Sequence, residues 1–195
     1  MDDIVKQAMA KWPNVPDCYG WLALDARGVW RMRDERAQQL NLPGDKVVQA
    51  ALLAFINRNY DVDERGCWFF QNGPQRVFVN LEATPYIART DPQQGLTVQT
   101  GATITPQAAY LSETGALIVV ADNIVAQVDD RDVVQLLAKL HSDGVPASDE
   151  AVLAWMAGGP GSLRLALGQA DIAVERIASD DIARRFGFVR LPGQG

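Results

Sequence analysis

Short apolar runs separated by turn residues cover much of the chain, and four pairs of them have the pattern of β-hairpins. Within each pair a few residues rich in Asp, Asn, Gln or Gly separate two apolar runs, which is typical of antiparallel strands joined by a tight turn. The weaker alternation from Leu96 to Thr105 predicts one or two further strands. The eight hairpin strands are predicted over residues 19–24 and 29–33, 67–70 and 76–81, 117–121 and 124–128, and 163–167 and 171–177.

Apolar residues at helical spacing predict helices between and beyond the hairpins. Asp45 fits an N-cap, and the apolar positions after it predict an amphipathic helix of about 14 residues. The single histidine, His141, falls at the expected end of a later helix, where its charge would favour the helix dipole. The other expected helices cover residues 4–12, 132–141, 148–156 and 179–186.

The order hairpin, helix, hairpin occurs twice, and a shift of 95 residues places one set on the other. Gly20 then falls on Gly115 and Gly73 on Gly168, so turn residues coincide. This pattern predicts an α+β fold of two related halves, each a hairpin, a helix and a second hairpin (ββαββ), with the hairpins packed on helices. Two unrelated hairpin pairs with similar turns are the alternative. The expected organisation is an N-terminal lead-in over 1–18, a first unit over 19–90, a connector with strands over 91–113 and a second unit over 114–190.

Composition narrows the class of protein. The chain has 195 residues, with 24 acidic and 18 basic side chains, and a formal charge of −6. These values argue against disorder and against a strongly basic nucleic-acid binder. The sequence has no apolar run of membrane-spanning length and no signal-peptide pattern, so we expect a cytoplasmic bacterial protein without membrane contact. Cys18 and Cys67 are too few for a disulfide scaffold or a zinc site, and we expect two buried free thiols rather than a redox pair.

The familiar catalytic and cofactor motifs are absent from the sequence. It contains no P-loop and no nucleophile elbow, and the glycines of residues 158–161 lack the dinucleotide-binding spacing. The carboxylates of residues 129–132 fit the start of a helix, where they complement its dipole. We therefore predict no catalytic residue, no metal site and no cofactor.

The two predicted halves differ in charge and aromatic content, which points to the first half for a binding site. The first half is nearly neutral and rich in Trp and Phe, whereas the second carries the acidic excess. Strand alternation puts Arg31 and Arg33 on one face and Trp30 on the other. Arginine suits recognition of carboxylate or phosphate. The candidate ligand-binding residues are Trp30, Arg31, Arg33, Trp68 and Arg76. A solvated outer face over an aromatic core, or packing of the basic half on the acidic half, would explain the same residues.

Parts of the first half resemble the bacterial domain-of-unknown-function family 1285. The resemblance lies in Arg27-Gly28-Val29-Trp30, in Leu52-Leu53-Ala54-Phe55 and in the segment from Val77 to Tyr86, which ends Leu81-Glu82-Ala83-Thr84-Pro85-Tyr86. The family's G-x-P-I-R segment after the first hairpin is missing, because Met32-Arg33-Asp34-Glu35-Arg36 stands there. The resemblance implies an α+β fold with repeated motifs and a role in signal transduction, and it supplies no catalytic residues.

Three functions are compatible with these observations. The leading hypothesis is a non-catalytic binding or regulatory protein that recognises a small anionic ligand or a protein partner. The first alternative is a small enzyme acting on an anionic metabolite, with arginine clamps and Glu82 or Asp34 as the base. The second is a structural or dimer-forming subunit, which leaves a homo-oligomer possible.

Overall fold

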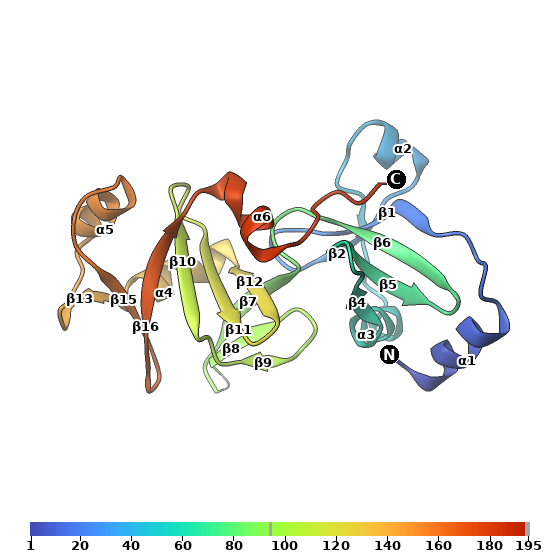
Figure 1. Ribbon diagram of the computed structural model, residues 1–195, viewed down its shortest axis with the longest axis horizontal. Helices are drawn as coiled ribbons and strands as arrows, with labels where there is room; N and C mark the ends of the chain where they lie inside the picture. Colours follow the sequence, from blue (N-terminus) through green and yellow to red (C-terminus); the bar gives the residue numbers. More distant parts are fainter. Residues whose placement is uncertain (94, 194–195) are drawn as a thin grey trace. The chain divides into compact units, whose positions relative to one another are not determined.

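The computed structural model describes residues 1–93 and 95–193, and these residues form a mixed α+β fold with two sheets (Figure 1). The chain divides into two compact units. The first unit contains Met1–Pro85 and the C-terminal residues from Gly187 onward, and the second contains Tyr86–Phe186. The first unit is therefore assembled from both ends of the chain.

A six-stranded sheet forms the centre of the first unit. The strands follow the order β3-β2-β1-β6-β5-β4, in which β1 and β6 are parallel and the other neighbours are antiparallel. The elements of this unit are α1 (Asp3–Lys11), β1 (Cys18–Leu24), β2 (Trp30–Met32), α2 (Glu35–Gln39), β3 (Asp45–Lys46), α3 (Ala50–Arg58), β4 (Tyr60–Val62), β5 (Trp68–Asn72) and β6 (Gln75–Leu81).

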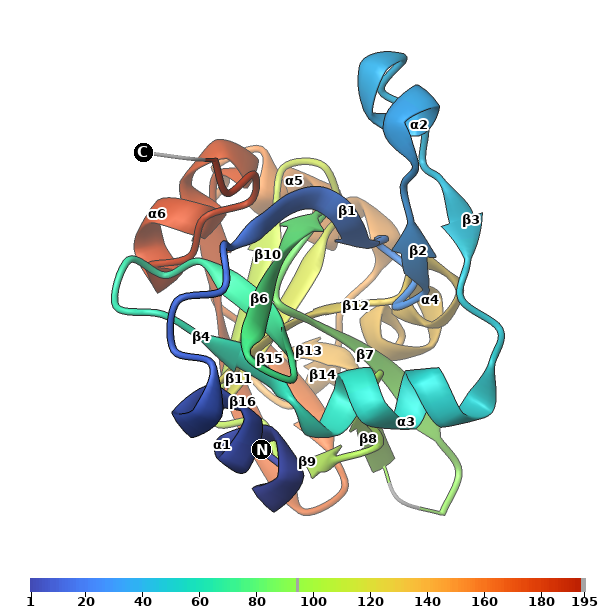
Figure 2. The same ribbon diagram turned by 90° about the vertical axis from the view of Figure 1, so that its right-hand side faces the viewer.

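Helix α3 packs on the sheet of the first unit and fixes its buried side (Figure 2). The ring of Phe55 meets Phe70 edge to face with 5.4 Å between centroids. The indole of Trp30 donates to Asn57 on the same helix at 2.8 Å. Trp30 is buried, and the apolar side chains of β1 and β6 at Leu24 and Leu81 are buried with it. Burial of these large side chains supplies most of the stabilising free energy of such a sheet–helix layer.

The C-terminal segment completes the sheet end of the first unit. The Val189 N–H donates to the Gly66 carbonyl at 2.9 Å, and the Leu81 N–H donates to the Arg190 carbonyl at 2.8 Å. Gly66 has a positive φ of 78°, and a Cβ there would lie 2.1 Å from the Gly187 carbonyl oxygen. Only glycine permits this approach, so Gly66 is needed for the C-terminal segment to dock.

A ten-stranded sheet forms the second unit. Its strand order is β14-β13-β15-β16-β10-β11-β12-β7-β8-β9, with parallel pairs at β10–β16 and β12–β7. Apolar side chains from most of its strands and from α4 and α5 join one buried cluster that includes Leu111, Val119, Leu136 and Trp155. The elements are β7 (Tyr86–Asp91), β8 (Gly95–Val98), β9 (Thr103–Ile104), β10 (Ala108–Ser112), β11 (Leu117–Ala121), β12 (Ile124–Val128), α4 (Asp130–Leu137), β13 (Leu140–Ser142), β14 (Val145–Pro146), α5 (Asp149–Met156), β15 (Leu163–Leu167), β16 (Ala170–Ile177), a 3-10 turn (Ser179–Asp181) and α6 (Ile182–Phe186).

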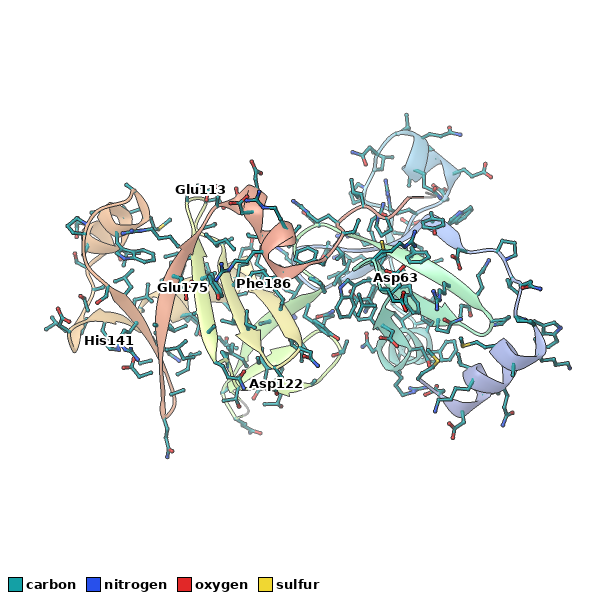
Figure 3. All side chains as sticks on the ribbon, viewed as in Figure 1. Asp63, Glu113, Asp122, His141, Glu175 and Phe186 are labelled. Carbon is teal, nitrogen blue, oxygen red and sulfur yellow. The ribbon has the colours of Figure 1, made fainter. Side chains whose placement is uncertain are left out.

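The four predicted hairpins are present as β1–β2, β5–β6, β11–β12 and β15–β16, and the α+β class is confirmed. Two details of the helix predictions were wrong. Asp45 is not an N-cap, because it lies in β3, and α3 begins only at Ala50. His141 does not end a helix, because α4 stops at Leu137 and His141 pairs with Arg164 across β13 and β15 (Figure 3).

Candidate functional site

The turn between β1 and β2 fixes the position of Arg31. One carboxylate oxygen of Asp25 accepts hydrogen bonds from the backbone N–H groups of Arg27 at 3.0 Å and Val29 at 2.8 Å, and the other accepts from Arg31 Nε at 2.8 Å. Arg31 Nη1 also donates to the Gly44 carbonyl at 3.2 Å. The two charged side chains are only 20% and 11% exposed. An aspartate turn thus holds a largely buried ion pair whose guanidinium cannot swing away.

Arg33, two residues along the same face, is held by the loop after α2. Its guanidinium donates to the carbonyls of Leu42 at 3.1 Å and Ala37 at 3.3 Å, and to the Asn41 side-chain oxygen at 3.3 Å. The Ala37 carbonyl lies in the short helix α2 and also accepts from the Leu42 N–H at 2.8 Å, whereas the Leu42 carbonyl and Asn41 belong to the loop that follows the helix. Arg33 is buried, and it therefore positions the loop of residues 40–44 as well as lining the site.

These two arginines line one hollow of about 340 Å³, which we call the arginine hollow. It lies at the carboxyl ends of the parallel strands β1 and β6, where Leu24 is paired with Leu81. The Glu82 carboxylate accepts from the Ala26 N–H at 2.9 Å and so connects the two strand ends. Further lining residues that bear on recognition are Asn41, Leu42, Asn80 and Leu191.

The charges in the arginine hollow balance. Arg31 and Arg33 supply two positive charges, while Asp25 and Glu82 supply two negative ones. Such a surface does not trap anions by net charge. It offers directed donors and acceptors side by side, with the apolar side chains of Leu42 and Leu191 beside them.

The other predicted site residues lie elsewhere in the first unit. Trp30 is buried on the α3 side of the sheet, edge-on to Tyr60 at 5.1 Å between centroids. Trp68 also packs on Tyr60, at 4.8 Å. Arg76 lies over the ring of Phe69 at 4.7 Å. The structure thus brings together Arg31 and Arg33 and places Trp30, Trp68 and Arg76 outside the hollow.

Sequence reasoning missed Asn80, which lines the arginine hollow, and named Glu82 only as a candidate base. Strand alternation could have found Asn80, because its neighbours Val79 and Leu81 are buried on the opposite face. The pairing of Asn80 with Ala23, next to Arg31 across the sheet, could not be read from the sequence, because β1 and β6 are distant in the chain.

The carboxylates considered as catalytic groups have structural roles. Asp34 accepts from the Ala37 N–H at 2.7 Å as the N-cap of α2. In the second unit, Asp129 is fully buried as the N-cap of α4 and accepts from Arg89 at 3.0 Å and from Arg131. Burial raises the pKa of the Asp129 carboxyl; the hydrogen bond from Arg89 opposes this shift, and Asp130 adds to it. Asp129 belongs to the second unit and is not among the residues that line the arginine hollow.

The histidine has one polar partner on its ring, and its other ring nitrogen, Nδ1, is buried without a partner among the described residues. His141 Nε2 lies 2.8 Å from an Asp171 carboxylate oxygen, and Arg164 donates to the other oxygen at 2.7 Å. Cys18 and Cys67 are free thiols, the first half-buried and the second buried. Burial raises the pKa of both thiols, which lowers their reactivity as nucleophiles.

No helix among the described residues has both the length and the apolarity to cross a bilayer.

Among solved structures, the fold is similar to that of a DUF1285 family protein from Silicibacter pomeroyi DSS-3. The TM-score is 0.50 and the sequence identity is 12%, over 90% of this chain and 96% of that one. A second DUF1285 family protein, from Shewanella baltica OS155, has a TM-score of 0.39 and 12% identity over 57% of this chain and 85% of that one. The first likeness confirms the resemblance to that family at the level of the fold.

None of the curated proteins matches the chain. A family model described as "Protein of unknown function (DUF2946)" matches residues 1–193. The match spans nearly the whole sequence, both compact units included. The chain therefore belongs to the DUF2946 family of proteins of unknown function.

Proposed function

We propose that this protein is a non-catalytic cytoplasmic binding protein, and that the arginine hollow recognises a carboxylate group on a small ligand or on an acidic segment of a protein partner. The observation that carries the proposal is the convergence of Arg31 and Arg33 on one hollow, each held in place by the protein's own acceptors. A guanidinium fixed in this way loses little conformational entropy on binding, and its planar fork matches a carboxylate.

The state of the nearby carboxylates supports binding over catalysis. Asp25 accepts three hydrogen bonds, and Glu82 accepts a backbone N–H. A general base needs a lone pair directed at the substrate proton and a pKa near the working pH. Carboxylates already engaged with the backbone and with Arg31 are suited to orienting the site. The two free cysteines agree with a reducing compartment.

Titration calorimetry with succinate, citrate and a hexapeptide of glutamate tests this proposal. We expect one of these probes to bind the wild type, and Arg31→Lys to weaken it at least tenfold, because lysine keeps the charge but loses the fork. Asn80→Ala should weaken binding without touching the ion pair. Arg76→Gln is the matched control, since Arg76 lies outside the hollow, and it should leave binding unchanged. Absence of binding by all three probes, or equal losses for Arg76→Gln and Arg31→Lys, would show the proposal to be wrong.

We also propose that the two units descend from one duplicated ββαββ ancestor. The order β3-β2-β1-β6-β5-β4 in the first sheet parallels β12-β11-β10-β16-β15-β13 in the second, with a parallel pair at the centre of each. The second hairpins support the shift of 95 residues, since Phe69 pairs with Phe78 and Arg164 with Ala173.

The first hairpins correspond at a different register from the one expected. In the β1–β2 turn, the Asp25 N–H donates to the Val29 carbonyl and the Gly28 N–H donates to the Asp25 carbonyl. The β10–β11 turn has the same two bonds, from the Ser112 N–H to the Ala116 carbonyl and from the Gly115 N–H to the Ser112 carbonyl. On this proposal Gly28, not Gly20, is the counterpart of Gly115. Alignment of family members would test the idea: similarity between residues 21–34 and 108–121 no better than chance would contradict it.

A further inference from the structure

A second hollow, of about 490 Å³, lies in the second unit and is lined by none of the residues that the sequence pointed to. It is bounded by the end of β7, by β8 and β9, by the last turn of α4 and by the turn between β15 and β16. We call it the lysine hollow, after Lys139 on its rim. All of its lining residues belong to the second unit, so it is independent of the arginine hollow.

The floor of the lysine hollow is apolar and firmly packed. Leu96, Ile104 and Leu136 line it, and all three are buried members of the core of the second unit. Leu167 and Ala170 line it too and pack against that core. A floor built from core side chains keeps its shape when solvent leaves, which is the usual condition for binding an apolar group.

The rim carries a cation that lacks a partner. Lys139 lies two positions after the end of α4, and its ammonium makes no ion pair or hydrogen bond with residues 1–93 or 95–193. Other basic side chains of the second unit are engaged: Arg89, Arg131, Arg164, Arg184 and Arg185 with carboxylates, and Arg176 with backbone carbonyls. Among the lysine and arginine side chains of the second unit, Lys139 at the mouth of the apolar hollow is therefore the cation available to a ligand.

The rest of the rim narrows the chemistry of the ligand. Thr90, Thr105 and Gln135 add neutral polar groups, and Asp91 adds a carboxylate that accepts from the Gln93 N–H at 2.8 Å. A phosphate carries about two negative charges and normally takes several donors or an arginine fork. A single lysine beside a carboxylate matches a group with one negative charge. We propose that the lysine hollow binds a small monocarboxylate with an apolar tail, its carboxylate on Lys139 and its tail on Leu96, Ile104 and Leu136.

Titration of isotope-labelled protein with octanoate, followed by amide NMR shifts, tests this proposal. We expect the amides of Gly95, Leu96 and Gly168 to shift in a saturable way. Lys139→Gln should weaken binding at least tenfold, and Lys46→Gln, an exposed lysine on β3 of the first unit, should not change it. Octylamine, which has the same tail and the opposite charge, should bind more weakly than octanoate.

A second variant separates loss of the ion pair from loss of the hollow. Thr105 is an exposed lining residue, so Thr105→Trp should fold and fill the space, and it should abolish the shifts. Octanoate shifts confined to other parts of the protein would overturn the proposal, as would equal affinity in the wild type and Lys139→Gln. Because the arginine hollow lies in the other unit, either site can fail while the other stands.

Discussion

Replacing Asp25 by asparagine measures how strongly the arginine hollow depends on the ion pair with Arg31. Asparagine keeps an oxygen for the N–H groups of Arg27 and Val29, so the turn survives and mainly the charge opposite Arg31 is lost. Exposed ion pairs contribute about 0–1 kcal/mol, and removing one partner of a buried pair costs about 3–5 kcal/mol. With side chains 20% and 11% exposed, this pair lies between those limits. We expect the free energy of unfolding to fall by about 2 kcal/mol.

Urea denaturation followed by tryptophan fluorescence is the appropriate assay. Four of the five tryptophans, Trp12, Trp21, Trp30 and Trp68, belong to the first unit, so the signal reports mainly on that unit. The molecule supplies its own control in Asp63 (Figure 3). As at Asp25, one carboxylate oxygen accepts from two backbone N–H groups, those of Arg65 and Cys67, and the other accepts from an arginine, Arg65 Nε. Arg65 is 52% exposed, so solvent screens this pair.

Asp63→Asn should therefore cost less than Asp25→Asn. A loss below about 0.5 kcal/mol for Asp25→Asn, the range of ordinary surface substitutions, would refute the reasoning. So would a loss for Asp63→Asn as large as that for Asp25→Asn. Added salt should reduce the effect of Asp63→Asn more than that of Asp25→Asn, because buried charges are screened less.

Three further outcomes are expected. Arg33→Met should lower the free energy of unfolding by about 2–3 kcal/mol, because the Leu42 carbonyl and the Asn41 side-chain oxygen lose the guanidinium as donor and the Ala37 carbonyl keeps only the Leu42 N–H, and limited proteolysis should then cut first within residues 40–44. The hydrogen bond from Arg164 lowers the pKa of Asp171 below 3.8, so the ionised carboxylate stabilises the fold at neutral pH, and this stabilisation is lost as the pH falls through the lowered pKa. In thermal melts at several acidic pH values, the melting temperature of Asp171→Asn should therefore fall less with decreasing pH than that of the wild type. Cys67 should react with iodoacetamide slowly in the folded protein and rapidly in urea, as mass spectrometry can follow, since burial raises the pKa of its thiol; rapid labelling of the folded protein would contradict this.

Local sequence patterns identified the hairpins but not the strand pairings between them. Turn residues sit between strands only a few positions apart, so the four hairpins were readable from short-range signals. The parallel pairs β1–β6 and β10–β16 join segments far apart in the chain. Strand β10 was also missed, because Ala108–Ser112 is almost wholly buried and shows no alternation of polar and apolar residues.

Helical spacing misled the prediction at two places where the sheet uses the same residues. Leu140 follows Leu136 by four positions and fits a helix. It lies instead in β13, where it is buried and pairs with Leu165 of β15. Val47 fits the helix after Asp45, yet its N–H donates to the Trp30 carbonyl at 2.9 Å. In both cases pairing with a distant strand outweighed the local preference.

The sequence likewise predicted only the part of the candidate site that depends on local pattern. Period-two alternation separated Arg31 and Arg33 from Trp30, and the structure places the two arginines in one hollow. Two other members of the hollow, Asn80 and Leu191, come from β6 and from the C-terminal segment. Neither is near β2 in sequence, so their presence depended on long-range topology.

Docking of Val189 and Arg190 against Gly66 and Leu81 sets an order of events during synthesis. All residues of the second unit leave the ribosome before those C-terminal residues do, so the second unit can fold while the first still lacks its last piece. Until then the Gly66 carbonyl and the Leu81 N–H have no partner from the C-terminal segment, and the arginine hollow lacks Leu191. A chain that stops before residue 187 would therefore carry its damage in the N-terminal unit, far in sequence from the missing residues.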